Sequence, residues 1–495
     1  MLPCHVTLPI QSRAPTGQRE RGQRARVSRS IFLLSLLWLL SLAVSRRASG
    51  QGFGIYEHGT CAMGRAGATV ADPCDDGSAI FFNPAALAGQ QGWRTSAGVT
   101  LFVVTGGFTA DETGRETELD VAPIPLPHLY ITYGLSDRLA AGLGVFVPYG
   151  LQTKWPLDFE GRFLGYDNSL FSFYVHPTVA YRPLDWLSIG GGPILVISRA
   201  SLNQRIDLST QPLPALPGVP PGTTFGQLGI PFHTDFADAQ FEASGATGFG
   251  GHFAVRVQAT KRLSFGGRYM SRVPLDYEGD ADFTQVRTGI ALPGNNPFGL
   301  PAGTPLDLLL SQAGIFAEDG PLADQEGSAE ITMPDQLILG LAYRFSSRLQ
   351  LLADWQWVNW SEFDRVVIEF TNPSTPSSVR IENYDDTNAI RVGAEYEIDP
   401  TWSLRGGYLF HQAASPDATV TPLLPEANRN EVTAGIGWRA SDLLELNLAY
   451  QYIRQDDRRG RVREAPPGEV PTAELNSGLF DFTGHLFGGT VTLRF

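Results

Sequence analysis

Long apolar runs are scarce in this sequence of 495 residues. The longest, Ile31–Val44, follows a segment that contains six arginines between residues 13 and 29. It is shorter than the roughly 20 residues that a membrane-spanning helix needs, but it has the length of a signal-peptide core. Small side chains at Ala48 and Gly50 predict cleavage before Gln51, so we expect residues 1–50 to be a leader and the remainder to be exported. The alternative is an N-terminal anchor helix; no other segment approaches the length of a membrane helix.

Positive charge is also scarce. The formal net charge is −14, and residues 1–50 account for eight arginines and one glutamate. The rest therefore has 29 basic and 50 acidic residues and a net charge of −21. A protein this acidic is repelled by a phosphate backbone, which argues against nucleic acid as a partner.

Cysteine occurs only three times, and Cys4 belongs to the predicted leader. The two that remain, Cys61 and Cys74, are 13 positions apart in a glycine-rich segment. In an oxidising compartment such a pair predicts a disulfide, which would contribute roughly 3 kcal/mol by restricting the unfolded chain. The alternative is two free thiols. Only His58 stands near them and no second pair of ligands is present, so we expect neither a metal site nor a cofactor.

What the sequence has in abundance is period-two alternation. In Phe253–Thr260 and Ala389–Ile398, apolar residues alternate with polar and charged ones, as in a strand between an apolar and a wet medium. Short turns such as Ser136-Asp137 alternate with long Pro- and Gly-rich connections, of which residues 200–250 and 280–332 are the longest. This arrangement is typical of outer-membrane barrels with short periplasmic turns and long external loops. We therefore predict an all-β fold, a transmembrane antiparallel β-barrel of about 14 strands over residues 93–495. The alternative is a large soluble β protein.

Tryptophans lie near the predicted strand ends. Two groups stand out: Trp186, Trp402 and Trp438 close to short turns, and Trp355, Trp357 and Trp360 together at one strand end. Such positions favour an aromatic girdle at the level of the lipid headgroups, with core filling as the alternative.

The segment before the barrel, residues 51–92, has a different composition. It contains Gly52–Gly54, Gly64–Gly67 and Asp72–Gly77, which are turn-prone and have too few apolar side chains for a separate core. We interpret the aspartates of the last run as a solvated turn rather than a cation site. The segment continues to Asn83-Pro84-Ala85, where the fixed φ of proline favours a turn. A segment that cannot fold alone and precedes a barrel predicts a hatch, or plug, inside the lumen.

The leader, hatch and barrel together resemble the FadL family of outer-membrane transporters for long-chain fatty acids and other hydrophobic compounds. The motifs that carry the resemblance are Gly64–Gly67, Phe82–Ala85, Pro148–Leu151, Met333–Asp335 and Asn359–Phe363. Asn83, Pro84 and Ala85 match the family's hatch motif, whereas the cysteine pair lies outside the family pattern. The resemblance implies a non-enzymatic, monomeric protein of the bacterial outer membrane. Its partners would be membrane lipid and a hydrophobic small molecule.

Pro148, Tyr149 and Gly150 fall at the end of a predicted strand. Proline lacks the N–H that the strand ladder needs, and glycine invites a bulge. The resemblance implies that a kink in the third strand opens the barrel wall sideways, so we expect a lateral exit for the ligand here. The alternative is a strand that simply ends in its loop.

The two longest loops are the predicted place of ligand capture. Leu306, Leu309 and Leu310 follow helical spacing, and Phe316 lies shortly after them. Apolar side chains on external loops need a partner if they are exposed. The resemblance implies a hydrophobic ligand groove at these four residues, with loop self-packing as the alternative.

Two other functions have less support in the sequence. A general porin for small polar solutes needs an open lumen, which a hatch would block. An outer-membrane lipid hydrolase needs a nucleophile, but no Gly-x-Ser-x-Gly motif is present and the histidines are scattered, so we expect no catalytic residues. A charged ligand head would need a cation, and four arginines fall on predicted lumen faces: Arg256, Arg268, Arg344 and Arg391.

Overall fold

The computed structural model describes residues 52–213, 219–294, 296, 300–463 and 477–495. The predicted signal peptide lies outside these ranges. Within them, no helix has the length and apolar character needed to cross a bilayer.

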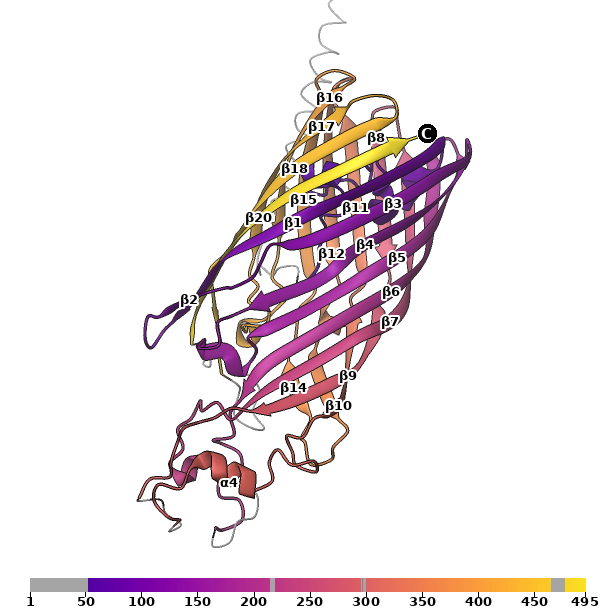
Figure 1. Ribbon diagram of the computed structural model, residues 1–495. Helices are drawn as coiled ribbons and strands as arrows, with labels where there is room; N and C mark the ends of the chain where they lie inside the picture. The colour runs from indigo at the N-terminus through magenta and orange to yellow at the C-terminus, as the bar shows by residue number, and fades with distance from the viewer. Residues whose placement is uncertain (1–51, 214–218, 295, 297–299, 464–476) are drawn as a thin grey trace, which may run out of the picture. The chain divides into compact units, whose positions relative to one another are not determined.

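The strands form one closed antiparallel barrel of 14 strands (Figure 1), which confirms the fold predicted from the alternation. The first strand, β1 (Gly92–Ala110), pairs with β3 (Ile124–Ser136) on one side and with the last strand, β20 (Gly478–Arg494), on the other. This last pairing closes the barrel. The further uninterrupted strands are β4 (Leu139–Lys154), β5 (Asp167–Leu184), β6 (Leu187–Ile206), β7 (Ala237–Gln258), β16 (Trp402–His411), β17 (Arg429–Arg439) and β18 (Leu444–Gln455).

The other four spanning strands are each broken into two pieces. They are β8 (Leu263–Met270) with β9 (Val273–Gln285), β11 (Gln336–Arg344) with β10 (Gln325–Met333), β12 (Leu349–Val358) with β13 (Arg365–Phe370), and β15 (Thr387–Glu397) with β14 (Ser378–Ile381). The pieces pair in the same order on both sides of the breaks, so the breaks are neighbours in the wall. Pro334, which has no N–H for the ladder, lies in one of them. Two short strands, β2 (Glu116–Glu118) and β19 (Arg458–Gly460), extend the sheet beside β1 and β20.

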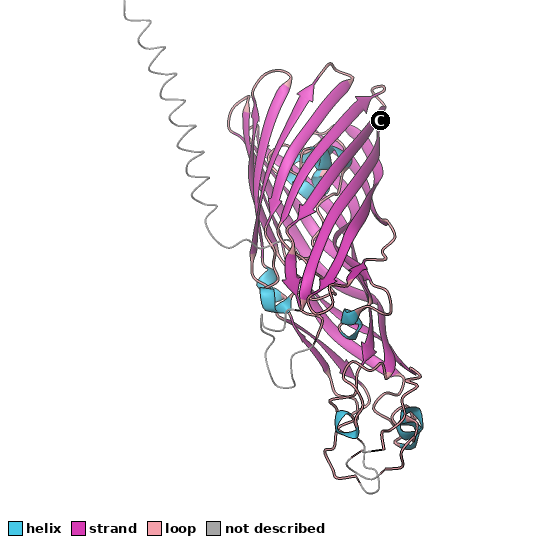
Figure 2. Ribbon diagram, turned by 90° about the vertical axis from the view of Figure 1, so that its left-hand side faces the viewer, coloured by secondary structure: helices cyan, strands magenta, loops and turns pink. Residues whose placement is uncertain are grey.

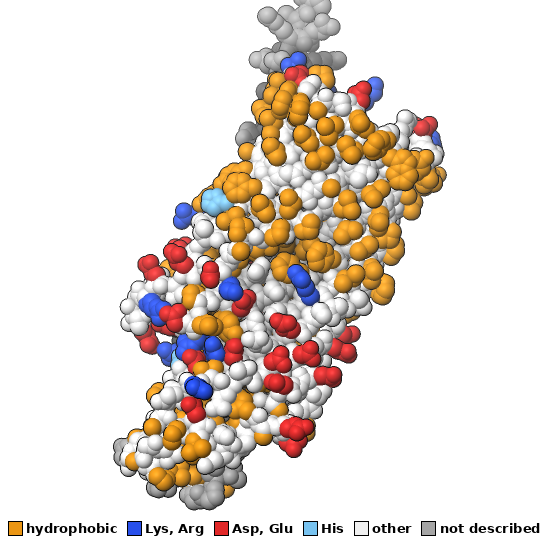
Figure 3. Space-filling model, viewed as in Figure 1, with side chains coloured by type: hydrophobic (Ala, Val, Ile, Leu, Met, Phe, Trp, Pro, Cys, Tyr) orange, Lys and Arg blue, Asp and Glu red, His pale blue; other side chains and the backbone are white. Residues whose placement is uncertain are grey.

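The outer face of the barrel is apolar over the half that contains the short turns (Figure 3), whereas charged side chains gather toward the long loops. Exposed apolar residues recur at alternate positions along the strands; examples are Leu101, Leu129, Leu143, Val179 and Ile189. Trp402 and Trp438 are exposed and stack at 5.7 Å beside short turns, as the girdle prediction requires. For Trp360 the girdle prediction was wrong: this side chain is fully buried, because the break between β12 and β13 turns it inward.

The hatch, residues 52–91 in the described chain, lies inside the barrel (Figure 2) and most of its residues are buried. Helix α2 (Thr60–Gly64) contacts β16, β17, β18 and β20, α3 (Ala79–Phe82) contacts β4, and the 3-10 helix η1 (Pro84–Leu87) contacts β5, β6 and β7. Hatch side chains such as Phe53 and Phe81 share one hydrophobic cluster with Phe146 and Tyr174 of the wall. The segment therefore folds by using the barrel as its core.

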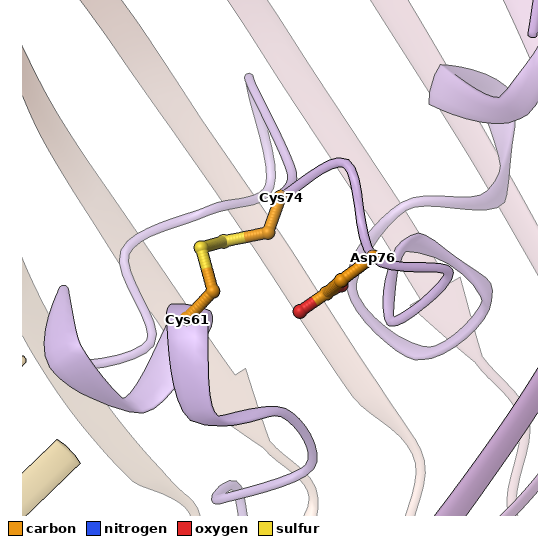
Figure 4. Close-up of side chains that lie close together, drawn as sticks. All are labelled: Cys61, Cys74 and Asp76. Atoms are coloured by element: carbon orange, nitrogen blue, oxygen red, sulfur yellow. A yellow bond between two sulfur atoms is a disulfide. The ribbon is translucent and has the colours of Figure 1, made fainter. Parts of the chain in front are cut away.

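A disulfide joins Cys61 on α2 to Cys74, across a Cα–Cα distance of 6.2 Å. The carboxylate of Asp76 lies close to both sulfurs (Figure 4) and accepts a hydrogen bond from the Ser78 N–H at 3.0 Å. These three residues are the one group of possible metal ligands found in the described part of the chain. Both sulfurs are used by the disulfide, so the group acts as a staple between α2 and the turn before α3.

The strands extend into both of the predicted long loops, so the connections themselves span residues 207–236 and 286–324. The first connection contains η3 (Gly226–Leu228) and the second contains α4 (Leu306–Gln312). Figure 1 shows α4 among the loops that extend beyond the strand ends. The two loops share a separate hydrophobic cluster that includes Phe225, Leu228 and Leu292. Three further 3-10 turns occur in the connections between strands: η2 (Glu160–Phe163), η4 (Trp360–Glu362) and η5 (Asp417–Thr419).

Candidate functional site

A bulge in β4 interrupts its pairing in the barrel wall at Pro148. The register of β4 against β5 shifts between Phe146 and Tyr149, and the pairing of β4 with β3 ends at Leu129 and Val145. Strand β3 has five further residues toward its start, Ile124–His128, but the described β4 residues beyond Val145 do not pair with them. Because proline has no N–H to donate, the ladder cannot continue smoothly through this point. The backbone groups of β4 that face β3 are therefore left without a strand partner.

The N-terminal end of the hatch bonds to β4 at this bulge. The Ile55 N–H donates to the Pro148 carbonyl at 2.8 Å, and the Gly150 N–H donates to the Phe53 carbonyl at 2.9 Å. Gly54 and Tyr149 form an antiparallel bridge between these two bonds. An unpaired strand edge is costly inside a protein, and the hatch supplies the missing partner.

The Phe53 ring is the side-chain anchor of this contact. It meets Trp360, Phe363 and Tyr149 edge to face, with ring centroids 4.7, 5.3 and 6.1 Å away. The preceding Gly52 has a φ of +56°, and a Cβ there would lie 2.6 Å from the Trp360 indole. Only glycine fits both this backbone conformation and this close approach.

Two cavities lie beside Phe53. The first, of about 150 Å³, is bounded by the hatch, by β3 and β4 at the bulge, and by β1, β17, β18 and β20. The second, of about 120 Å³, is bounded by β5, β6, β7 and the pieces β9, β10, β13 and β14. Phe53, Leu151 and Leu424 line both cavities, and both linings are mainly apolar. Burial of each CH₂ of a ligand in such a lining contributes about 0.8 kcal/mol.

The motif Asn83-Pro84-Ala85 fastens the hatch to the opposite wall. The Asn83 amide donates to the carbonyls of Val70 at 2.6 Å and Val255 at 3.0 Å, while its oxygen accepts from the Ala85 N–H at 3.1 Å and caps η1. Gly190 of β6 allows this approach, since a Cβ there would lie 2.6 Å from the Ala85 nitrogen. These contacts give the motif a structural role.

The body of the hatch is held by charged groups of the wall. Arg65 pairs with Glu395 at 2.7 Å, and Asp72 pairs with Arg256 at 2.5 Å. Asp354 accepts hydrogen bonds from the N–H groups of Thr69 at 2.7 Å and Val70 at 2.9 Å. Hydrogen bonds that involve a charge are roughly twice as strong as neutral ones. The body is therefore fixed more firmly than the end at Phe53–Ile55, which has two neutral backbone bonds.

Burial changes the acid–base properties of the hatch residues between these two parts. It raises the pKa of Tyr56 to about 12, against the opposing effect of Arg268 and Arg391. It lowers the pKa of His58 to about 3, with smaller contributions from His128 and Arg268. His58 is therefore neutral while the hatch is docked at neutral pH.

The four arginines predicted to face the lumen are not equivalent. Arg256 is paired with the hatch as described, and Arg344 is exposed at the end of β11. Arg268 and Arg391 are fully buried against the hatch, and the Arg391 guanidinium lies 4.4 Å from the centre of the Tyr56 ring. None of these four lines either cavity.

The predicted groove residues Leu306, Leu309 and Leu310 are buried, with at most 5% of their surface exposed, and Phe316 is partly buried beside them. They form the shared core of the two long loops, as the alternative of self-packing predicts. A ligand reaches these side chains only if the two loops separate.

Phe53 is a residue of the site that the motifs do not predict, and Trp360 belongs to the site and not to the girdle. Phe53 is the one aromatic residue within Gly52–Gly54, and an aromatic side chain between two glycines was the available signal. Four of the scattered histidines, His128, His176, His252 and His411, are buried.

These features define the class of the protein: a β-barrel of the bacterial outer membrane with an internal hatch. The comparisons with known proteins agree. The chain belongs to the family described as outer membrane protein transport protein (OMPP1/FadL/TodX), whose model matches residues 41–495.

Among curated relatives, outer membrane protein P1 of Haemophilus influenzae is 23% identical over 447 residues, covering 86% of this chain and 90% of the relative. The long-chain fatty acid transport protein of Escherichia coli K12 is 22% identical over 449 residues, covering 88% and 95%. Among solved structures, a FadL homologue of Pseudomonas aeruginosa has a TM-score of 0.72 at 20% identity and covers 90% of this chain and 100% of that chain. The toluene transporter TodX of Pseudomonas putida has a TM-score of 0.63 at 18% identity, with 90% and 99% covered. At these identities the structural likeness is one of fold.

Proposed function

We propose that this protein carries long-chain fatty acids or other hydrophobic compounds across the outer membrane and releases them sideways through the wall between β3 and β4. The relatives named for fatty acid and toluene transport support the compound class. The apolar cavities beside the bulge support the route. We expect the protein to work as a monomer in contact with membrane lipid.

One observation carries the lateral route: the hatch end occupies the backbone of β4 that β3 leaves unpaired. Ile124 and Leu126 of β3 and Gly150–Thr153 of β4 border the same cavity. Withdrawal of Phe53–Ile55 would therefore connect that cavity with the gap in the wall. Two backbone bonds to β4, the Phe53 anchor and the 3.0 Å hydrogen bond between the His58 ring and the Ile55 carbonyl oppose this withdrawal, whereas the hatch body can stay in place.

Capture by the external loops is the first step of the proposal. Leu306, Leu309, Leu310 and Phe316 would contact the ligand after the loops part, and Leu308 and Phe232 are exposed on the outside of the same loops. Replacing Leu308 by Asp removes exposed apolar surface and leaves the loop core intact. We expect weaker oleate binding to this variant; unchanged binding would remove the outer face of α4 from the capture step.

A general porin is the competing function. The described hatch lies inside the barrel and contacts strands around its circumference, which opposes an open polar channel. Conductance of the reconstituted protein tests this point directly. We expect low conductance for small ions in the wild type and an increase when residues 52–88 are deleted.

A crosslink tests the lateral route. Replacing both Gly54 and Tyr149 by Cys joins two residues that are bridge partners, so oxidation should lock the hatch end against β4. We expect the oxidised variant to lose uptake of oleate and toluene, and reduction to restore it. If the locked protein transports at the wild-type rate, the hatch end does not have to move.

The matched control replaces Thr105 and Thr483 by Cys. Their hydroxyl oxygens lie 2.8 Å apart across β1 and β20, a seam of continuous pairing. This crosslink should leave transport unchanged. Transport by the wild-type protein is also measured with and without reductant, because reduction also breaks the Cys61–Cys74 disulfide.

A further inference from the structure

The charged part of the mainly apolar cavity at the bulge is acidic. Its charged residues are three carboxylates, Glu57 on the hatch, Glu426 before β17 and Glu431 on β17, and one cation, Arg429. The remaining lining is apolar or uncharged. This is unusual for a cavity that would hold a fatty-acid carboxylate, because like charges raise the energy of the bound ligand.

The three carboxylates are bonded to uncharged donors. Glu57 accepts hydrogen bonds from the Gln451 amide at 2.9 Å and from the Tyr56 N–H at 2.9 Å. Glu431 accepts from the same Gln451 amide and from the His411 ring at 3.0 Å. In the described chain none of the three has a lysine or arginine within ion-pair distance. Among the described residues, the three carboxylates are therefore held by hydrogen bonds and not by ion pairs with lysine or arginine.

Glu426 is likewise bonded to uncharged donors, and one of its two oxygens can accept a further hydrogen bond. One of its oxygens accepts from the N–H groups of Ala414 at 2.5 Å and Ser415 at 2.6 Å. The other oxygen is buried and has no hydrogen-bond partner among the described residues. A buried acceptor without a donor is a costly arrangement, which a ligand that brings a donor would relieve.

Arg429 is one cation among three carboxylates in the cavity lining, so the lining keeps an excess of acidic groups. Its Nε donates to the Gln455 side chain at 3.3 Å, and it lies two residues from Glu431 on the same strand. Arg268 and Arg391 do not line the cavity, because Tyr56 and Phe81 of the hatch cover them. Burial and Glu431 raise the pKa of Glu57, but neither form of Glu57 supplies the positive charge that holds a carboxylate.

We propose that this cavity selects hydrophobic compounds whose polar end is a hydrogen-bond donor without negative charge, such as an alcohol or an ammonium group, and discriminates against carboxylates. Glu57 and Glu426 are the specificity-determining residues. The inference rests on the proposed function and narrows it from fatty acids and other hydrophobic compounds to the compounds without a carboxylate. The cavity adjoins the gap between β3 and β4, so its ligand is the compound at the release step.

The test compares three ligands with the same chain: 1-decanol, decylammonium and decanoate, each below its micelle concentration. Binding to the full-length mature protein in a nonionic detergent at pH 8.5 is followed by tryptophan fluorescence, because Trp360 is buried beside Phe53. We expect decanol and decylammonium to bind at least about tenfold more tightly than decanoate. The variants Glu57→Gln and Glu426→Gln should each reduce this ratio to about threefold or less.

Glu160→Gln, on the external turn η2, is the matched control and should keep the wild-type ratio. Equal or tighter binding of decanoate by the wild type would overturn the inference and leave the proposed function standing. A wild-type preference that neither variant changes would overturn the assignment to this cavity. Binding of none of the three ligands would instead contradict the proposed function itself.

Discussion

Replacing Phe53 by Ala should release the end of the hatch from β4 while the hatch body stays docked. Phe53 is only 5% exposed and makes three edge-to-face ring contacts. The substitution removes these contacts and enlarges the two cavities that Phe53 lines. The backbone bonds at Ile55 and Gly150 remain possible, but they lose the aromatic contacts that stabilise them.

The magnitude follows from the burial of the ring. Phe-to-Ala changes in protein cores cost about 3–5 kcal/mol. Because existing cavities flank Phe53, part of its surface has no close packing partner, and we take the low end, about 3 kcal/mol. At about 1.4 kcal/mol for each factor of ten, the undocked population should rise by roughly 150-fold.

Hydrogen exchange measures this population directly. The Ile55 and Gly150 amides are bonded across the contact, so their exchange should accelerate by about two orders of magnitude in the variant. Amides of the hatch body, such as Met63, should change little, because ion pairs and the disulfide hold that part.

The control is Phe482→Ala. Phe482 lines the same cavity, but its ring contacts in the described chain are with Trp155 and Phe480 of the barrel. The Phe482→Ala variant should leave hydrogen exchange at the Ile55 and Gly150 amides unchanged. If Phe53→Ala also leaves both amides protected, the aromatic anchor is not what holds the hatch end, and the account of the lateral opening fails.

Three further predictions concern the hatch. Replacing both Cys61 and Cys74 by Ser should destabilise the hatch by roughly 3 kcal/mol and accelerate exchange at residues 60–78 without affecting barrel amides. Asn83→Ala removes a helix cap and leaves buried carbonyls unpaired, so it should lower the free energy of hatch unfolding, measured with urea, by about 2–3 kcal/mol. Asn83→Asp keeps the cap oxygen and should lower this free energy by less. His58 has a pKa of about 3 in the docked hatch and near 6.5 when released, so the released state binds more protons. The free energy of hatch docking should therefore fall by about 1.4 kcal/mol per pH unit between pH 6.5 and about pH 3. Conductance should rise over the same range. A His58→Gln variant that keeps the full pH dependence would show that His58 is not the titrating group.

The barrel could be predicted from the sequence because the bilayer imposes a local rule on every strand. Each strand needs apolar residues at alternate positions, and each pair of strands needs one short and one long connection. The alternation is visible within a single strand, and the lengths of the connections are visible between one strand and the next. The hatch was predictable for a related reason, since residues 51–92 have too little apolar surface to fold alone.

The contacts of the site depend on strand order, tilt and register, which the tertiary structure alone decides. Phe53 meets Trp360, more than 300 residues later in the chain, because β12 breaks before β13 and turns the indole inward. Alternation cannot report such a break, so Trp360 was assigned to the girdle. Leu306, Leu309 and Leu310 were recognised as an apolar helical face, but whether that face meets a ligand or the neighbouring loop is set by how two distant loops pack. Likewise, Pro148 and Gly150 mark a bulge in the sequence, while only the folded chain brings Phe53 and Ile55 to its backbone.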